Sequence, residues 1–249
     1  MKKIISFAFF VQVMVAYAIC PAPSSSPQWL SSSSGIEQYV WVLDDADKWQ
    51  SIAEEPLNRL IDDYHEFVAD NTSLDQIGLL ERQQGIFARF FGSQHPIVLQ
   101  FQALIDGDAG EIGEASCLDQ LLLSGQFDRV NYDIPTEFQA YIFERDNQLA
   151  IYVAWRTQPN VIGPPVQLTY DDIYELLGAG WVFDHQIHNH PFFFDNLPND
   201  MAGTVIPSGA DLNAFVYLNG LYPIDNYRIT NGLNTASYLT SDAEYLLSL

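Results

Sequence analysis

The chain has 249 residues, of which 48% are hydrophobic, so it can bury a full core as one large domain or as a smaller domain with an extension. Its 32 acidic and 10 basic residues give a formal net charge of −22, spread along the chain without long acidic runs. A surface of this charge repels polyanions, which argues against nucleic acid or an anionic membrane as a partner, whereas a basic protein or a cation-rich surface would be tolerated.

The first 18 residues have the features of a secretory signal peptide. Lys2 and Lys3 precede an apolar run over residues 4–15, and the small residues of Ala16-Tyr17-Ala18 fit a signal-peptidase site. We therefore predict cleavage after Ala18, a secreted or periplasmic protein, and no stable membrane insertion after cleavage. The alternative is an uncleaved anchor, although the apolar run is short for a transmembrane helix.

The two cysteines, Cys20 and Cys117, would meet an oxidising compartment after export, where they can pair. The other interpretation places Cys20 in a flexible tail and makes Cys117 a small buried residue of a helix. The sequence leaves both interpretations open.

The N-terminal half divides by composition and periodicity. Residues 19–38 are rich in proline and serine, which predicts a linker without a fold of its own. Over residues 39–113 the apolar residues repeat at helical spacing, which predicts an N-terminal helical extension. The helices expected in this half are 56–68, 79–91, 96–106 and a fourth at about 114–124, which we assign to the domain that follows.

Residues 114–249 are expected to form one domain in which strands and helices alternate. The expected elements after residue 135 are, in chain order, a hairpin of strands 138–143 and 149–155 joined by a turn at residues 144–147, a helix over 169–177, a strand over 181–187, a helix from Ser208 to about Gly220, a hairpin turning at Asn231-Gly232, and a helix after Ser241. This order predicts an α+β fold with α/β-like features.

His188 and His190 lie two residues apart at the end of the strand predicted over 181–187. Alternate residues of a strand point to the same side, so both imidazoles face one way while the apolar odd positions of the strand face the core. Two neutral imidazoles are half of a zinc site, and a catalytic zinc takes a third protein ligand and leaves one position for water. Asp211, in the first turn of the helix that Ser208 caps, is the candidate third ligand.

Other interpretations of the histidines were weighed. His185 falls on the apolar side of the strand, so we interpret it as a core or supporting histidine and not as a ligand. A pair of surface histidines is one alternative, and an HxH pair from an amidohydrolase barrel is another. Such a barrel needs eight βα units, and too few residues follow the signal and the helical half.

The motif His188-Asn189-His190-Pro191, followed by Ser208-Gly209-Ala210-Asp211 and preceded by a glutamate near a strand start, resembles the signature of the JAMM (MPN-plus) zinc metallopeptidases. Within that family it is most similar to the RadC-like, JAB-domain branch. The resemblance covers roughly the second half of the chain and implies a curved mixed β-sheet flanked by helices over residues 114–249. The family usually has seven residues between the second histidine and the serine, whereas here seventeen residues (191–207) separate His190 from Ser208, so an insertion within residues 192–207 is implied.

The resemblance also implies a role for five residues. His188, His190 and Asp211 would hold Zn²⁺, Glu137 would act as general acid/base on the attacking water, and Ser208 would donate a hydrogen bond to the oxyanion. The expected function is that of an exported zinc-dependent metallopeptidase or isopeptidase that hydrolyses a peptide or isopeptide bond.

Simpler interpretations remain open for the residues outside the histidine pair. Glu137 is then an exposed acid among the 32 of the chain, with Glu144 as the second candidate base. Ser208 is then a helix cap alone, and Asp211 a carboxylate favoured by the helix dipole. In a further alternative, the third metal ligand is an aspartate of the 192–207 segment and not Asp211. The alternative function is a secreted non-catalytic binding module on a JAMM-like fold, which the wide spacing within the motif suggests.

Overall fold

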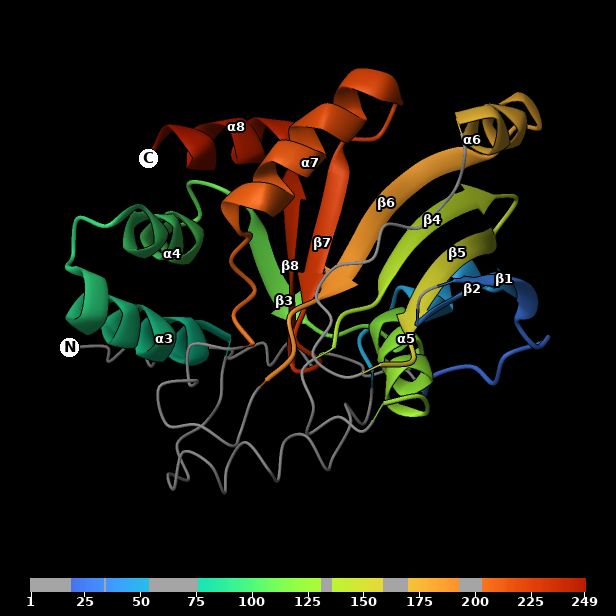
Figure 1. Ribbon diagram of the computed structural model, residues 1–249, viewed down its shortest axis with the longest axis horizontal. Coiled ribbons are helices and arrows are strands. Elements are labelled where there is room, and N and C mark those ends of the chain that lie inside the picture. Colours follow the sequence, from blue (N-terminus) through green and yellow to red (C-terminus); the bar gives the residue numbers. More distant parts are fainter. Residues whose placement is uncertain (1–18, 34, 54–75, 131–135, 159–169, 193–202) are drawn as a thin grey trace, which may run out of the picture.

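The computed structural model describes residues 19–33, 35–53, 76–130, 136–158, 170–192 and 203–249. In these residues the chain forms an open eight-stranded mixed sheet and seven helices (Figure 1). The strands are β1 (Gln28–Ser33), β2 (Ile36–Asp44), β3 (Glu111–Glu114), β4 (Gln139–Arg145), β5 (Gln148–Arg156), β6 (Val182–Asn189), β7 (Asn226–Thr230) and β8 (Asn234–Leu239). The helices are α1 (Ala46–Trp49), α3 (Gln76–Phe91), α4 (Pro96–Asp106), α5 (Cys117–Phe127), α6 (Tyr170–Gly178), α7 (Gly209–Leu221) and α8 (Thr240–Ser248).

The strands lie side by side in the order β1-β2-β5-β4-β6-β7-β8-β3. The pair β6–β7 runs parallel, and the other neighbouring pairs run antiparallel. The expected α+β class with a mixed sheet flanked by helices is therefore confirmed. Both predicted hairpins, β4–β5 and β7–β8, are also confirmed.

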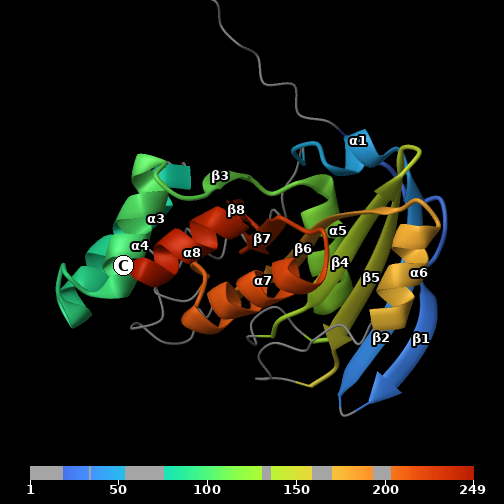
Figure 2. The same cartoon turned by 90° about the horizontal axis from the view of Figure 1, so that it is seen from above.

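Both faces of the sheet are covered. On one face, apolar residues of β4, β5, β7 and β8 pack against α3, α4, α6, α7 and α8, and α7 and α8 lie side by side (Figure 2). On the other face, apolar residues of β2, β4 and β5 pack against α1 and α5. We call these the α7 side and the α5 side of the sheet.

A β-bulge in β6 changes the side to which its residues point. The pairing with β4 leaves Asp184 as an extra residue between Phe183 and His185, so the alternation of side chains shifts by one position. Phe183 packs into the core of the α7 side, whereas Ile187 packs into the core of the α5 side. The expectation that all odd positions of this strand face one core is therefore wrong. As a result of the shift, His188 lies on the α7 side, next to Phe215 of α7.

The proline- and serine-rich segment is part of the sheet and not a linker. Residues 28–33 form the edge strand β1, and residues 36–44 form β2, so the linker expected over 19–38 is wrong. Composition misleads at an edge strand, because its side chains stay exposed and polar residues such as the serines of β1 are tolerated there.

The helical extension expected over 39–113 is also incorrect at both ends. β2 pairs along its whole length with β5, and β3 pairs with β8, so the start and the end of this segment belong to the same sheet as residues 114–249. Between them, α3 and α4 match two of the expected helices. The helix predicted over 56–68 and the signal peptide lie outside the described residues. No described helix is both long and apolar enough to cross a membrane.

Cys20 and Cys117 form a disulfide, with their Cα atoms 5.3 Å apart. The bond connects the segment that precedes β1 to the first residue of α5, across a sequence separation of 97 residues. Of the two interpretations that the sequence leaves open, the structure therefore shows the pair.

We predict that replacing Cys20 and Cys117 together by serine lowers the free energy of unfolding by about 4 kcal/mol, because a crosslink across a loop of this length restricts the unfolded chain by about that amount. Denaturant unfolding of the variant and of the oxidised protein measures the difference. The reduced wild-type protein is the control, since it keeps both side chains and loses only the bond. Equal stability of the oxidised and reduced proteins would contradict the prediction.

Candidate metal centre

The connection between β6 and β7 brings the candidate ligands together. Parallel neighbours need a crossover connection, and α7 lies within the one that joins these two strands. The N-terminus of α7 therefore lies near the C-terminal end of β6 (Figure 1). His188 and His190 are at that end of β6, and Asp211 is in the first turn of α7, so three side chains from two elements converge.

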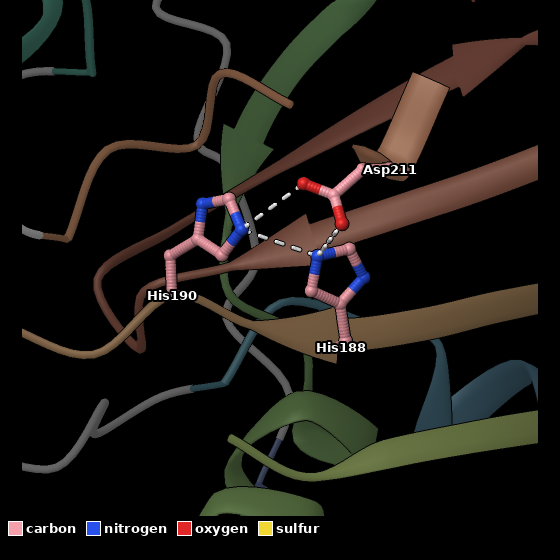
Figure 3. Close-up of side chains that lie close together, drawn as sticks. All are labelled: His188, His190 and Asp211. Atoms are coloured by element: carbon pink, nitrogen blue, oxygen red, sulfur yellow. Dashed lines mark hydrogen bonds and ion pairs between the residues drawn. The ribbon is translucent and has the colours of Figure 1, made fainter. Parts of the chain in front are cut away.

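Figure 3 shows His188, His190 and Asp211 pointing toward one another. The Nε2 atoms of the two histidines are 3.2 Å apart, and each lies 3.5 Å from one oxygen of Asp211, Oδ1 for His188 and Oδ2 for His190. Ligand atoms about 2.0–2.1 Å from a tetrahedral zinc lie about 3.3 Å from one another. The nitrogen–nitrogen distance is close to that value, one carboxylate oxygen faces each ring, and the three side chains could hold a metal ion.

The carboxylate of Asp211 is fixed by the start of its own helix. The Ser208 backbone N–H donates to Asp211 Oδ2 at 2.7 Å, and the Asp211 backbone N–H donates to Ser208 Oγ at 3.2 Å. The prediction that Ser208 caps this helix with Asp211 in the first turn is therefore confirmed. This reciprocal capping leaves Asp211 Oδ1 facing His188 and so presets the third ligand.

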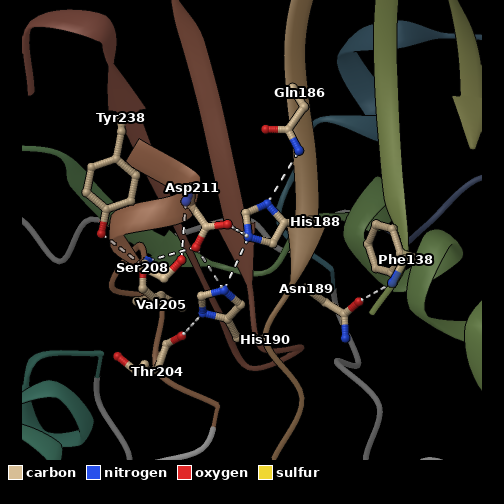
Figure 4. Close-up of polar contacts among 10 residues, drawn as sticks. All are labelled: Phe138, Gln186, His188, Asn189, His190, Thr204, Val205, Ser208, Asp211 and Tyr238. Carbon is tan, nitrogen blue, oxygen red and sulfur yellow. Dashed lines mark hydrogen bonds and ion pairs between the residues drawn. The ribbon is translucent and has the colours of Figure 1, made fainter. Parts of the chain in front are cut away.

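The orientation of His190 is set by a backbone carbonyl. Its Nδ1 lies 2.8 Å from the carbonyl oxygen of Thr204, as Figure 4 shows. A carbonyl oxygen only accepts, so Nδ1 carries a proton and the neutral ring presents its lone pair at Nε2. His190 is thus held in the tautomer that a metal ligand needs.

The charges of the three residues shift one another's pKa. Burial lowers the pKa of His188 to about 4, and the neighbouring His190 adds to that shift. Burial also disfavours the charged form of His190, but the hydrogen bond and negative charge of Asp211 outweigh it and raise the pKa of His190. Burial alone would raise the pKa of Asp211, yet its bond to His190 and the charges of both imidazoles hold that pKa well below its ordinary value. At neutral pH His188 is therefore neutral and Asp211 ionised, as metal binding requires.

His188 and Asp211 border a pocket of about 390 Å³ that lies between α7 and the strands β4 and β6. Glu137 and Ser208 line the same pocket, and the negative charge of Glu137 contributes to the raised pKa of His190. The rest of the lining is apolar at Phe138, Ala210, Ala214, Phe215 and Leu218 and polar at Gln139 and Gln186. Four of the five residues that the resemblance singled out thus line one pocket, and the fifth, His190, lies against two of them, His188 and Asp211.

The described residues that were alternatives for the base and for the metal ligands, Glu144 and His185, do not lie in the candidate ligand group or in the pocket lining. Glu144, the second candidate base, is on β4 and not in the turn, and its Oε2 accepts a hydrogen bond from Gln50 Nε2 at 3.3 Å, away from the pocket lining. His185 is fully buried, and its Nδ1 lies 2.7 Å from Asp184 Oδ2, outside the candidate ligand group. Asp195 and Asp200, the aspartates that would replace Asp211, lie outside the described residues.

Asn189, between the two histidines, is a supporting residue to which the sequence assigned no role. It is completely buried, its Oδ1 accepts a hydrogen bond from the Phe138 N–H at 2.7 Å, and its Nδ2 donates to the Thr136 carbonyl oxygen at 3.1 Å. Figure 4 shows the contact with Phe138. The two backbone groups flank Glu137 in the sequence, so Asn189 fastens the segment that carries Glu137 to the end of β6. Its place inside the histidine motif was the one available sequence signal.

Comparison with known proteins gives no relative for this chain. No family model, no curated protein and no solved structure matches it. What the chain does is therefore inferred from the geometry of its own site.

We predict that Asn189→Ala lowers the free energy of unfolding by about 3 kcal/mol, because it removes the hydrogen bonds that the buried Asn189 side chain makes with the Phe138 N–H and the Thr136 carbonyl. Metal binding should persist, since no ligand atom is removed. Asn213→Ala is the control: the Asn213 side chain is exposed and bonds only within α7, to the Gly209 carbonyl, so its loss should change stability by less than about 0.5 kcal/mol. Denaturant unfolding compares the two variants, and equal effects would show that Asn189 is not a structural clamp.

Proposed function

We propose that this protein is an exported zinc-dependent hydrolase of peptide or isopeptide bonds, related to the JAMM metallopeptidases. The observation that carries the proposal is that Glu137 and Ser208 line the pocket bordered by His188 and Asp211, two members of the candidate ligand group that His190 completes. These residues come from three separate segments of the chain. A motif that matched the family by chance would have no reason to assemble in this way.

The donor set suits zinc in a catalytic site. Two imidazole nitrogens and one carboxylate oxygen are a common set of three protein ligands for catalytic zinc, with the fourth position open. The same set also holds Fe(II) in oxygenases, but a carboxylate base and a hydroxyl donor beside the open position favour hydrolysis. Bound zinc would supply a water of lowered pKa and a Lewis acid for the substrate carbonyl.

The chain's own residues would supply the proton transfers. Glu137 takes a proton from the water that attacks the carbonyl carbon and delivers it to the amine nitrogen as the C–N bond breaks. Ser208 Oγ already accepts a hydrogen bond from the Asp211 N–H, so its own proton is available to donate to the carbonyl oxygen as negative charge develops there. The helix cap therefore holds this hydroxyl in place.

Export is part of the proposal and is supported by the disulfide. Cys20 and Cys117 are paired, and disulfides persist mainly in oxidising compartments outside the cytosol. The positive and apolar residues at the N-terminus have the pattern of a signal peptide that would be removed just ahead of Cys20.

We predict that Glu137→Gln lowers kcat for peptide or isopeptide hydrolysis by about 10²- to 10⁴-fold, because the amide cannot accept the proton. Zinc should stay near one equivalent per chain, since no ligand is changed. Cleavage of a panel of linear and branched peptides, followed by mass spectrometry, measures the activity, and elemental analysis measures the zinc.

Glu144→Gln is the matched control, because it makes the same substitution on β4 away from the pocket lining and should keep full activity. Full activity of the Glu137→Gln protein would refute the assigned role. Wild-type protein that contains no zinc, and that added zinc does not stabilise against heat, would instead favour a non-catalytic binding module.

A further inference from the structure

Gln186 is a buried polar residue beside the metal centre that the proposed mechanism does not use. It lies on β6 two positions before His188, is 1% exposed, and lines the same pocket. Its Nε2 lies 3.4 Å from His188 Nδ1, whereas its Oε1 is buried without a hydrogen-bond partner among the residues that the structure describes. A buried carbonyl oxygen without a hydrogen-bond partner destabilises the folded protein.

The neighbours of Gln186 in the sheet are two tyrosines. Across the sheet it pairs with Tyr141 of β4 and Tyr227 of β7, and both tyrosines are buried. The hydroxyl of Tyr227 is already engaged, since it donates to the Phe215 carbonyl oxygen at 2.6 Å. His188 is therefore the polar group to which the amide of Gln186 is directed (Figure 4).

The hydrogen bonds determine where the protons are in this arrangement. An amide nitrogen only donates, so His188 Nδ1 accepts from Gln186 and the proton of the neutral ring is on Nε2. In its neutral form His190 has a lone pair on Nε2, because its Nδ1 donates to Thr204. The His188 Nε2–H then lies between two acceptors, His190 Nε2 at 3.2 Å and Asp211 Oδ1 at 3.5 Å, where a metal ion would bind.

Metal binding requires the opposite tautomer of His188. To bind through Nε2 the ring must carry its proton on Nδ1, where it would then face the N–H of Gln186. A half turn of the carboxamide places Oε1 against the Nδ1–H instead, and this gives both groups a partner. Terminal amide torsions are broad and two-fold, so the turn itself is inexpensive.

We propose that Gln186 is a positioning residue of the metal centre, whose carboxamide supports one tautomer of His188 without metal and the other with metal bound. The role rests on the proposed zinc site. Glutamine can serve both states because it carries a donor and an acceptor. A carboxylate at position 186 would support only the metal-bound tautomer, and an aliphatic side chain would support neither.

The first measurement follows the tautomer of His188 by long-range ¹H–¹⁵N correlation NMR on protein with labelled histidine. In the wild-type protein we expect the His188 proton on Nε2 without metal and on Nδ1 after zinc is added. In Gln186→Leu the metal-free protein should lose this preference and show a mixture of both tautomers.

The second measurement is the zinc dissociation constant, obtained by competition with a chelator. Gln186→Leu should raise it about 10- to 100-fold, as is typical when a group that supports a metal-bound histidine is removed. Gln186→Glu should bind zinc at least as tightly as the wild-type protein, because its carboxylate accepts from the Nδ1–H. Gln100→Leu is the control: it removes another buried carboxamide, which donates to the Leu246 carbonyl oxygen at 3.1 Å, and should change neither zinc affinity nor tautomer.

The outcomes separate this inference from the proposed function. If Gln186→Leu binds zinc within about threefold of wild type, where a supporting role predicts at least tenfold, the inference is wrong and the zinc site stands. The same holds if His188 keeps its proton on Nδ1 in both states, or if Gln186→Glu binds more weakly than Gln186→Leu. If the wild-type protein binds no zinc, the proposed function fails, and the role of Gln186 fails with it.

Discussion

The parallel pairing of β6 with β7 determines where the candidate metal centre lies. The other neighbouring strands of the described sheet are antiparallel, so here the chain has to pass across a face of the sheet before it can pair again. Because α7 occupies that passage, its first turn arrives at the end of β6. A histidine pair and a capping aspartate then meet even though some twenty residues separate them in the sequence.

Features with local causes could be predicted from the sequence. The reciprocal Ser208–Asp211 cap depends on residues three positions apart, and the shared side of His188 and His190 follows from the alternation of a strand. The strands β1 and β2 could not be predicted. β2 pairs with β5, which lies far away in the chain, and β1 has the composition of a linker because most of its side chains are exposed. The composition of a segment indicates how exposed its side chains are, but it does not indicate which strand will pair with that segment.

The roles of the polar residues around the candidate ligands could not be predicted from the sequence either. The bulge at Asp184 shifts the alternation of β6 by one residue, and no periodicity within the strand signals it, because it arises from the register with β4. Asn189 and Gln186 looked like unremarkable polar positions of a strand. Their importance lies in the atoms opposite them: for Asn189 the backbone on either side of Glu137, and for Gln186 the ring of His188. The sequence therefore indicated the candidate ligands but not the polar residues that contact and support them.

The position of β2 has a consequence for how the chain folds. Ile36–Asp44 pairs with Gln148–Arg156, more than 100 residues later. In a chain synthesised from the N-terminus, β2 therefore cannot pair with β5 until the β4–β5 hairpin has been made. Such long-range pairing makes folding slow, because much chain entropy is lost before these contacts form. Until this pairing forms, Trp41 and Leu43 of β2 are not yet buried in the core that they share with Leu149 and Ile151 of β5.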